Sequence, residues 1–175
     1  MRRFILTGAP GAGKTTLIHA LAARGHAVVE EAATDVNAEL LAAGIADPSA
    51  APDFIDRIVA HQRGRRAQPD AALQFHDRSA ICTLALCRYL SLAEPPSLTA
   101  ELAGIAHEGF YERRVLFVDN LGFMTSTPVR RISFEESLRF ETIHQEVYRA
   151  LGYQLVLIPR ATVEERVGLV ERLAE

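Results

Sequence analysis

The sequence predicts an α/β fold in which a parallel sheet of about five strands carries helices on both faces. Three observations favour this class. Strand and helix patterns alternate along the chain, the strand segments are nearly all apolar, and a glycine-rich loop joins the first strand to the first helix. At 175 residues the chain is long enough for one good core and short for two, so we expect a single domain over residues 1–175.

The first strands and helix form one unit. The apolar residues 4–6 predict a strand, residues 16–23 predict a helix, and Gly25 is a helix-stop signal. Residues 26–30 (HAVVE) then predict a second buried strand. A strand, a helix and a strand in this order form a βαβ unit, and we expect its crossover to be right-handed.

The middle of the chain is mainly helical. Residues 34–43 predict a helix that Thr34 or Asp35 caps, and a turn-rich connector follows it. Residues 53–67 place apolar side chains on one side and arginines on the other, which predicts an amphipathic helix. The remaining elements expected here are a strand at residues 71–76 and helices at residues 79–92 and 98–107.

The last third of the chain continues the alternation. Residues 120–131 show no clear period, so we expect a loop there. Two later helices open with a capping box, in which a hydroxyl residue precedes a glutamate by three positions. The elements expected are strands at residues 114–118 and 153–158, a helix at residues 134–151 opened by Ser133 and Glu136, and a helix at residues 162–174 opened by Thr162 and Glu165.

Residues 8–16 (GAPGAGKTT), here called the phosphate loop, fill the pattern GxxxxGK[ST] between a strand and a helix. Backbone N–H groups in such a loop curl round a phosphate, and the helix N-terminus adds about half a positive charge. Lys14 would reach the β- and γ-phosphates, and the Thr15 hydroxyl would take one position on Mg²⁺. The nucleotide-binding residues expected are Gly8, Ala9, Pro10, Gly11, Ala12, Gly13, Lys14, Thr15 and Thr16.

The alternative for this loop is a glycine-rich turn that binds nothing. One feature of the composition favours binding, because Lys14 is the only lysine in a chain whose other basic residues, apart from histidine, are arginines. A single lysine at this position indicates a specific requirement for a compact ammonium group.

Composition excludes several classes of partner. The formal net charge of -3 offers no global attraction to nucleic acid or to anionic lipid, so we expect neither as a partner. No apolar run reaches the roughly 20 residues that span a bilayer. The residues before the phosphate loop do not read as a cleavable signal, and we therefore expect a cytoplasmic protein.

The cysteines and histidines do not show metal-ligand spacing. Cys82 and Cys87 lie five positions apart on an expected helix, about 140° round its axis, so they do not converge on one ion and are expected to be buried thiols. His61, His76 and His144 are scattered along the chain. We expect no metal site among these residues.

Four segments beside the phosphate loop carry a family resemblance. They read, in chain order, VVEEAA, DFIDRIVAHQ, FHDRS and EVYRALGY. In this order the sequence resembles the predicted ATPases of the AAA-domain type that are related to ribosylnicotinamide kinases, and more widely the nucleoside and nucleotide kinases, including thymidylate kinase. The resemblance covers nearly the whole chain. It implies a three-layer P-loop NTPase fold and an enzyme that binds ATP and Mg²⁺.

The resemblance also implies catalytic roles at the strand ends. Asp77 would hold Mg²⁺ through water, and Arg78 would lie near the transferred phosphoryl group; the alternative is a solvated surface pair. A glutamate at the end of the second strand would accept the proton of the acceptor hydroxyl, helped by a neighbouring carboxylate that raises its pKa. Because strand alternation brings only one of Glu30 and Glu31 to the site, we prefer Glu31. The alternative for Glu31 is an acid that favours a helix N-terminus.

Three further positions correspond to substrate and lid residues of the kinases. Gln62 would read the edge of a nucleobase with its amide, or else is an exposed polar residue. Arg130 and Arg131 correspond to an arginine-bearing lid over the phosphates, or else form a surface pair before a helix. Related sequences commonly carry an arginine where this chain has Thr34. The way this chain binds its substrate can therefore differ from that of the kinases. The arginines that follow Gln62, namely Arg63, Arg65 and Arg66, are expected to form a solvated face.

Two functions fit these residues. The first is a phosphotransferase that binds a nucleoside triphosphate and passes phosphate to an unidentified small-molecule acceptor held between Glu31 and Gln62. The second is a nucleotide-dependent switch with slow hydrolysis. Its support is the segment from Asp119 to Gly122, a DxxG that resembles the γ-phosphate-sensing turn of GTPases, although the chain contains no NKxD that would read guanine.

Overall fold

The computed structural model describes residues 1–67, 71–121 and 133–175, and it contains a five-stranded parallel sheet with the order β2-β3-β1-β4-β5. The predicted α/β class and parallel sheet are therefore confirmed. The strands are β1 (Arg2–Thr7), β2 (Ala27–Val29), β3 (Leu73–Asp77), β4 (Arg114–Val118) and β5 (Gln154–Ile158).

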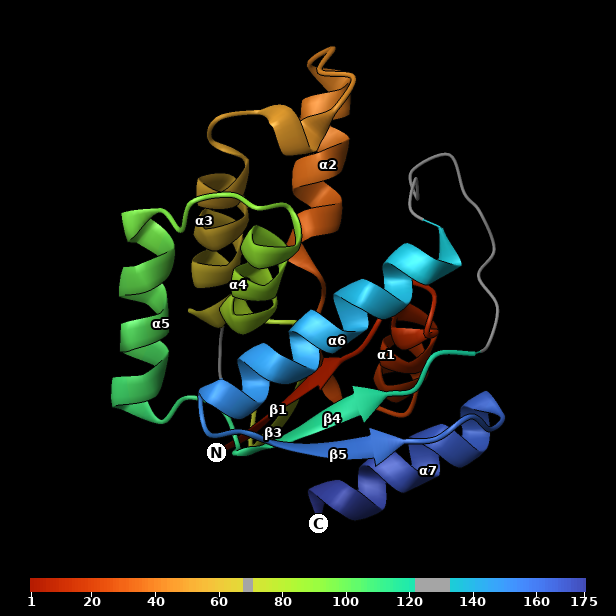
Figure 1. The fold of residues 1–175 in the computed structure, drawn as a ribbon. Coiled ribbons are helices and arrows are strands. Elements are labelled where there is room, and N and C mark those ends of the chain that lie inside the picture. The colour runs from red at the N-terminus through yellow and green to blue at the C-terminus, as the bar shows by residue number, and fades with distance from the viewer. Residues whose placement is uncertain (68–70, 122–132) are drawn as a thin grey trace.

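Helices cover both faces of this sheet. Figure 1 shows α7 below β5, α6 across the opposite face, and α2 and α3 rising beyond the sheet. The helices in the described ranges are α1 (Lys14–Ala23), α2 (Ala32–Ala42), α3 (Phe54–Arg66), α4 (Ala80–Tyr89), α5 (Pro96–Glu108), α6 (Phe134–Ala150) and α7 (Val163–Ala174), with a short 3-10 helix η1 (Pro48–Ala50) between α2 and α3.

The side chains of β1 alternate between two hydrophobic cores. Phe4 and Leu6 pack in a core shared with α1 and α7, whereas Ile5 packs in a larger core shared with α2 to α6. All three side chains are fully buried. A nearly continuous apolar run is what a central strand of a parallel sheet requires, because both of its faces are covered.

The register of the sheet brings the carboxyl ends of three strands together. Leu6 of β1 lies beside Asp77 of β3, and Val29 of β2 lies beside His76 of β3. The backbone N–H of Arg78 also donates to the Leu6 carbonyl, at 3.0 Å. The residues that follow these strands therefore meet at one edge, beside the phosphate loop that follows β1.

Two local predictions, one about the second strand and one about the start of the following helix, are wrong. β2 is an edge strand whose residues are half-buried, because only β3 pairs with it. Helix α2 begins at Ala32, with Glu31 as the N-cap residue in place of Thr34 or Asp35. The side chains of both expected cap residues make other contacts: the Thr34 hydroxyl donates to the Glu31 carboxylate, and Asp35 pairs with Arg65.

Both predicted capping boxes are confirmed. The Ser133 hydroxyl accepts from the Glu136 N–H at 3.1 Å, and the Glu136 carboxylate accepts from the Ser133 N–H at 2.6 Å. Thr162 and Glu165 exchange the same pair of bonds at the start of α7. These bonds satisfy backbone donors that the helix itself leaves unpaired, and so they define where α6 and α7 begin.

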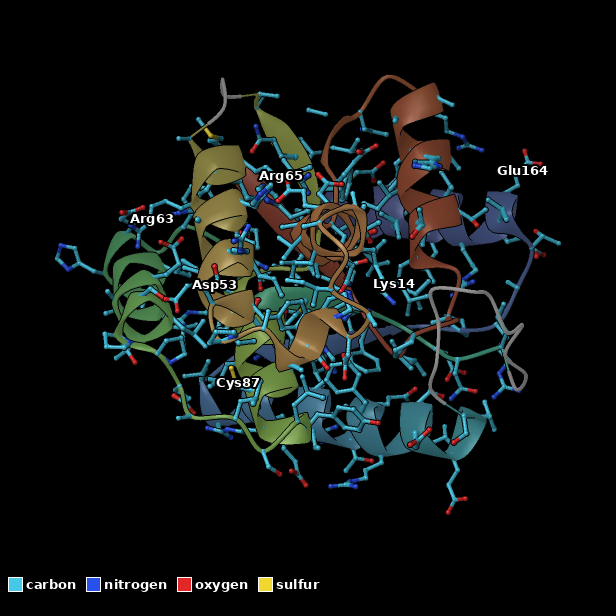
Figure 2. All side chains as sticks on the ribbon, turned by 90° about the horizontal axis from the view of Figure 1, so that it is seen from above. Lys14, Asp53, Arg63, Arg65, Cys87 and Glu164 are labelled. Carbon is cyan, nitrogen blue, oxygen red and sulfur yellow. The ribbon has the colours of Figure 1, made fainter. Side chains whose placement is uncertain are left out.

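The expectation of a solvated arginine face on α3 is wrong for Arg65 and Arg66, whose side chains are mostly buried, whereas Arg63 is exposed as expected. Arg63 and Arg66 both pair with Glu101 of α5, at 3.1 and 3.0 Å, and the Glu101 side chain is only 3% exposed. Figure 2 shows Arg63 and Arg65 on opposite sides of α3. Arg65 pairs with Asp35 of α2 and donates to the carbonyl of Glu30, which precedes that helix, at 2.6 Å. These arginines therefore hold α3 against its neighbouring helices.

The described ranges contain no membrane-spanning helix and no cluster of His, Cys, Asp and Glu metal ligands. None of their helices combines the length and the apolar character needed to cross a membrane. Across the same ranges, no three His, Cys, Asp or Glu side chains gather closely enough to hold a metal ion.

Candidate functional site

A cavity of about 730 Å³ extends from the phosphate loop to the helices beyond the sheet. Figure 2 places Lys14 near the middle of the molecule, where α1 begins. One end of the cavity is formed by the phosphate loop, and its walls come from α2, η1, α3, α4 and α6. Among the polar residues that line it are Lys14, Glu31, Gln62, Arg78 and Thr83.

The phosphate loop depends on glycines whose backbone other residues rarely adopt. Gly8, Gly11 and Gly13 have φ values of 142°, 85° and 82°. A Cβ atom on Gly8 would lie 2.3 Å from the carbonyl oxygen of Val118, so the loop passes too close to β4 for any side chain. The loop is thereby curled tightly against the end of the sheet.

Substitution of Gly8 by alanine is expected to lower the free energy of unfolding by about 3 kcal/mol or more, because it adds a clash to an unfavourable φ. Gly25→Ala is the matched control, since Gly25 also has a positive φ of 88° but no atom within 4 Å of its Cβ position. That control should cost only about 1 kcal/mol. Urea unfolding measures both, and equal losses would show that the approach to β4 contributes nothing.

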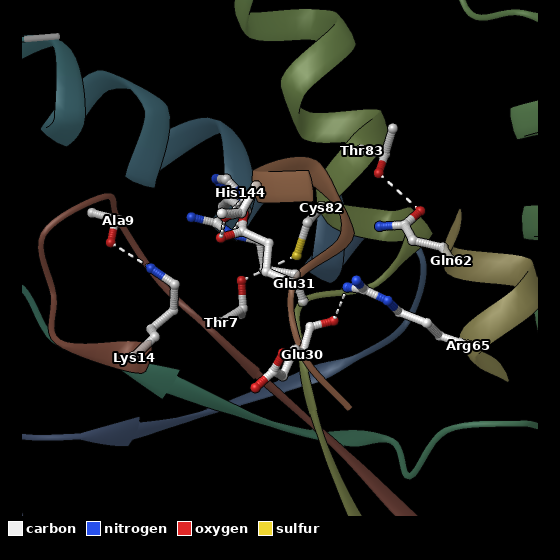
Figure 3. Close-up of polar contacts among 12 residues, drawn as sticks. Thr7, Ala9, Lys14, Glu30, Glu31, Gln62, Arg65, Cys82, Thr83 and His144 are labelled. Carbon is white, nitrogen blue, oxygen red and sulfur yellow. Dashed lines mark hydrogen bonds and ion pairs between the residues drawn. The ribbon is translucent and has the colours of Figure 1, made fainter. Parts of the chain in front are cut away.

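Lys14 lies inside the curl of the loop. Its side chain is 6% exposed, and its Nζ donates to the Ala9 carbonyl at 2.7 Å (Figure 3). Burial and the nearby Arg78 lower the pKa of Lys14 to about 7, although Asp77 and Glu31 act in the opposite direction. A bound polyanion would remove much of this penalty, because it would supply negative charge at the ammonium group.

Asp77 is a buried carboxylate with an unused oxygen. The residue is 5% exposed, and its Oδ1 has no hydrogen-bond partner within the part of the chain that the structure describes. Burial raises the pKa of Asp77, while Lys14 lowers it. Oxygen ligands are what Mg²⁺ prefers, so the chemistry of the Asp77 carboxylate, with its unpaired Oδ1, and of the Thr15 hydroxyl suits a magnesium ion.

Arg78 and Glu31 form an ion pair at the wall of the cavity. The Arg78 Nε atom lies 2.6 Å from Glu31 Oε1, and both side chains are at least three-quarters buried. Burial alone would raise the pKa of Glu31, but Arg78 and Lys14 outweigh it and hold this pKa below its usual value. The expectation that a neighbouring carboxylate raises the pKa of this glutamate is therefore wrong, because the positive charges of Arg78 and Lys14 lower it.

Of the two glutamates that follow β2, only Glu31 lines the cavity. Its side chain makes no capping bond to α2 among the described residues, because it turns to Arg78. Glu30 instead has a side chain that is 68% exposed and lies 3.8 Å from His19. The structure therefore brings Lys14, Glu31, Asp77 and Arg78 together and leaves Glu30 outside.

His144 is a residue of this site that the sequence did not indicate. It is fully buried on α6, where its Nδ1–H donates to the Phe140 carbonyl at 2.9 Å and its Nε2 accepts from Arg78 Nη1 at 3.3 Å. Burial and Arg78 lower the pKa of His144 to about 3, so the imidazole is neutral. A neutral acceptor holds the guanidinium of Arg78 without cancelling its charge.

Contacts with α6 hold the residues that follow Arg78. Arg78 has a φ of 70°. This left-handed conformation is unfavourable for any residue other than glycine. Tyr148, one turn after His144 on α6, shares hydrogen bonds with Ser79 and Cys82 at 3.1 Å each. His144 and Tyr148 lie four positions apart on the buried face of α6, and this spacing is the pattern that could have indicated this support in advance.

Residues 3–166 match the model of the AAA domain family. The chain belongs to this family. No curated protein sequence matches this AAA-domain protein significantly. Its fold is similar to a deoxyadenosine kinase from M. mycoides with bound dATP, at 11% identity and a TM-score of 0.66 over 99% of this chain and 98% of that chain.

Two further solved structures share the fold. A thymidylate kinase from Ehrlichia chaffeensis is 13% identical, with a TM-score of 0.65 over 99% of this chain and 98% of that chain. The NadR protein in complex with NAD and AMP-PNP is 18% identical, with a TM-score of 0.66 over 98% of this chain and 49% of that chain. The AAA-domain protein therefore has a P-loop NTPase fold of the nucleoside kinase type, as the resemblance implied.

The cavity of this AAA-domain protein is also lined by an amide and by aromatic and aliphatic side chains. Gln62 is half-buried, and its Oε1 accepts from the Thr83 hydroxyl at 3.1 Å (Figure 3). The interpretation of Gln62 as an exposed polar residue is therefore wrong. The apolar residues that line the cavity include Phe54, Ile58, Leu86, Tyr89 and Phe140.

The remaining site predictions have different outcomes. Cys82 and Cys87 are buried free thiols, as predicted, and Cys82 also lines the cavity. Arg130 and Arg131 lie outside the described residues, as does Gly122 of the DxxG segment. The residues before Gly122 are tied to the loop after β5, because Arg160 donates to Asn120 Oδ1 at 3.0 Å.

Proposed function

We propose that this AAA-domain protein is a Mg²⁺-dependent phosphotransferase that moves the γ-phosphoryl group of ATP to a hydroxyl group of a nucleoside-like acceptor. One observation carries the proposal. A single cavity joins the phosphate loop to Gln62, and Glu31 and Arg78 line it between these ends. A donor at one end and an acceptor at the other would meet beside these two side chains.

The donor end would hold the triphosphate. The N–H groups of the phosphate loop and the ammonium of Lys14 would contact the phosphate oxygens, and Asp77 and Thr15 would hold Mg²⁺. When bound, Mg·ATP supplies an electrophilic phosphoryl group whose charge the metal partly neutralises. We also propose that Arg130 and Arg131 cover the phosphates, since planar guanidinium groups suit the equatorial phosphoryl oxygens.

Glu31 and Arg78 would act on the reacting groups themselves. Phosphoryl transfer proceeds through a loose transition state that needs positioning more than strong proton abstraction. An ionised Glu31 with a low pKa can therefore orient the acceptor hydroxyl and take its proton late in the reaction. As Arg78 turns toward the charge on the phosphoryl group, its hold on Glu31 weakens and the Glu31 pKa rises toward that of a useful base.

The acceptor end fits a flat heterocyclic ring with a polar edge. Tyr89 and Phe140 form an aromatic pair with ring centroids 4.7 Å apart, and Phe54 lines the same cavity. Gln62 adds an amide, which offers both a donor and an acceptor to a base edge. Solved structures of similar fold contain dATP in the deoxyadenosine kinase and NR in NadR, which supports a nucleoside or ribosylated pyridine as the acceptor here.

A screen for thermal stabilisation tests this proposal. The protein with Mg²⁺ and AMP-PNP is melted with each member of a panel of nucleosides, nucleotides and ribosylated pyridines. A ligand at 100 times its Kd adds about 2.7 kcal/mol to the stability of the folded state, so a true acceptor raises the melting temperature further. Gln62→Leu should remove this additional rise and keep the rise due to AMP-PNP. A panel in which no compound adds to AMP-PNP would contradict the proposal.

The alternative of a nucleotide-dependent switch makes a different prediction. A switch would hydrolyse ATP at a rate that small acceptors leave unchanged and that a protein partner alters. A kinase would instead turn over ATP faster with one particular small acceptor. The cavity between the phosphate loop and Gln62 favours the kinase, because a switch needs no second pocket that could hold a small acceptor.

A further inference from the structure

Arg166 is a buried cation that the mechanism above does not use. It lies on α7, is 4% exposed, and packs against the outer side of the phosphate loop. Its Nη2 donates to the Ala12 carbonyl at 3.0 Å and lies 3.4 Å from the Asp119 carbonyl oxygen. One side chain thus connects α7, the phosphate loop and the end of β4.

The bond to Ala12 has a consequence for the next residue. In a trans peptide the C=O of one residue and the N–H of the following residue point in opposite directions. The chain contains no cis peptide bond among its described residues. While Arg166 holds the Ala12 carbonyl on the outer side of the loop, the Gly13 N–H must point to the inner side, where Gly13 lines the cavity.

Arg166 also lies directly against Gly13. A Cβ atom at Gly13 would be 3.3 Å from Arg166 Nη1, which is closer than most such contacts. The Arg166 Nε atom is buried and has no hydrogen-bond partner among the residues that the structure describes. A buried guanidinium that bonds mainly to neutral carbonyls is costly, and negative charge in the loop would offset part of that cost.

We propose that Arg166 is a positioning residue of the phosphate site, which aims the Gly13 amide at a bound phosphate and places a positive charge behind the loop. This inference depends on the proposed binding of a polyphosphate at the loop. Arg166 acts through the backbone and does not touch the ligand. It therefore differs from Lys14, whose ammonium group would contact the phosphates directly.

Calorimetric titration with inorganic tripolyphosphate tests the proposal without requiring turnover. Arg166→Met keeps much of the length of the side chain but removes its donors and its charge. It should weaken tripolyphosphate binding by about tenfold or more, the loss expected for one hydrogen bond to a charged group. Arg172→Met is the matched control, because Arg172 is exposed on the same helix and the net charge changes equally. This control should bind within about twofold of the parent.

The amide resonance of Gly13 separates positioning from a general loss of structure. In the parent it should shift on addition of tripolyphosphate, in Arg166→Met it should not, and in Arg166→Lys the shift should partly return. Binding of Arg166→Met within twofold of the parent, or a Gly13 shift as large as the parent's, would overturn the proposal. If Arg166→Met does not fold, the decision rests on Arg166→Lys, whose affinity should fall between the parent and Lys14→Met. The proposal would be overturned if Arg166→Lys bound tripolyphosphate as tightly as the parent while its Gly13 resonance did not shift on addition of tripolyphosphate.

The same titration distinguishes failure of this inference from failure of the proposed function. If the parent binds no tripolyphosphate, the phosphate site itself is wrong. If the parent binds and only Lys14→Met loses affinity, the phosphate site stands and the role of Arg166 falls.

Discussion

Replacing Lys14 with alanine is expected to abolish the rise in melting temperature that Mg²⁺ and AMP-PNP produce, while the fold remains intact. Within the described parts of the chain, the Lys14 side chain donates only to the Ala9 carbonyl, so its loss removes little from the ligand-free protein. In the proposed function, its ammonium group would be the main direct counter-charge that the phosphate loop offers a triphosphate. Differential scanning fluorimetry with and without ligand measures the effect. An unchanged rise would contradict the assignment of the whole phosphate site.

Lys14 should also give the ligand-free protein a characteristic pH dependence. Its pKa is about 7 in the folded protein, against an ordinary value of 10.5. The unfolded chain therefore binds more protons than the folded chain between these values, and this group makes stability rise with pH above about 7. Because Lys14 is the only lysine, no other lysine contributes to this slope.

Urea unfolding of the parent and of Lys14→Met between about pH 6.5 and pH 8.5 isolates this slope. The upper limit matters because burial raises the pKa of Cys87 to about 11, and that group makes stability fall as pH rises further. The difference in stability between parent and variant should change in favour of the parent as the pH rises. A difference that stays constant across the range would show that Lys14 keeps its ordinary pKa.

Substitution of Asp77 is the second large effect expected. Asp77→Ala should remove the dependence of AMP-PNP binding on Mg²⁺, because the variant lacks the buried carboxylate that would hold the ion. Asp77→Asn tests the charge alone and should give the same result. Both variants should remain as stable as the parent or become more stable, since the carboxylate is buried and its Oδ1 is unpaired within the described chain.

Titration of Mg²⁺ at a fixed AMP-PNP concentration, followed by calorimetry, measures this dependence. Glu30→Gln is the control, because Glu30 follows the neighbouring strand but has a side chain that is 68% exposed. The control should respond to Mg²⁺ as the parent does. A full response in Asp77→Asn would mean that the Asp77 carboxylate has only a structural role.

The parts of the fold that the sequence predicted are those with local signals. The apolar run of β1 followed by GAPGAGKTT indicated both the strand and the loop, because this pattern requires that context. The capping boxes at Ser133 and Thr162 each involve residues three positions apart, so a short window contains all of the information. The position of Arg78 was indicated in the same way, by an Asp-Arg pair directly after an apolar strand.

The parts that were missed depend on contacts between residues far apart in the chain. His144 contacts Arg78 across 66 positions, and Arg166 contacts Ala12 across 154 positions. Neither residue has a local pattern that names its partner. The pairing of Glu101 with the arginines of α3 was missed for the same reason, because only the packing of α5 beside α3 buries that carboxylate.

The electrostatic state of Glu31 could not be predicted from its neighbours in sequence. Glu30 lies beside it in the chain but faces solvent, whereas Arg78 lies 47 positions away and pairs with it at 2.6 Å. The sequence therefore indicated the correct residue types at the strand ends, but the sign of the pKa shift required the three-dimensional arrangement.

Transfer of radiolabel from γ-labelled ATP to the panel of nucleosides and ribosylated pyridines tests the central claim most directly. We expect one acceptor to become a labelled phosphomonoester in a Mg²⁺-dependent reaction that Lys14→Ala abolishes and Glu31→Gln slows. Label that appears only as inorganic phosphate, at a rate that no acceptor changes, would contradict the assignment of this AAA-domain protein as a phosphotransferase.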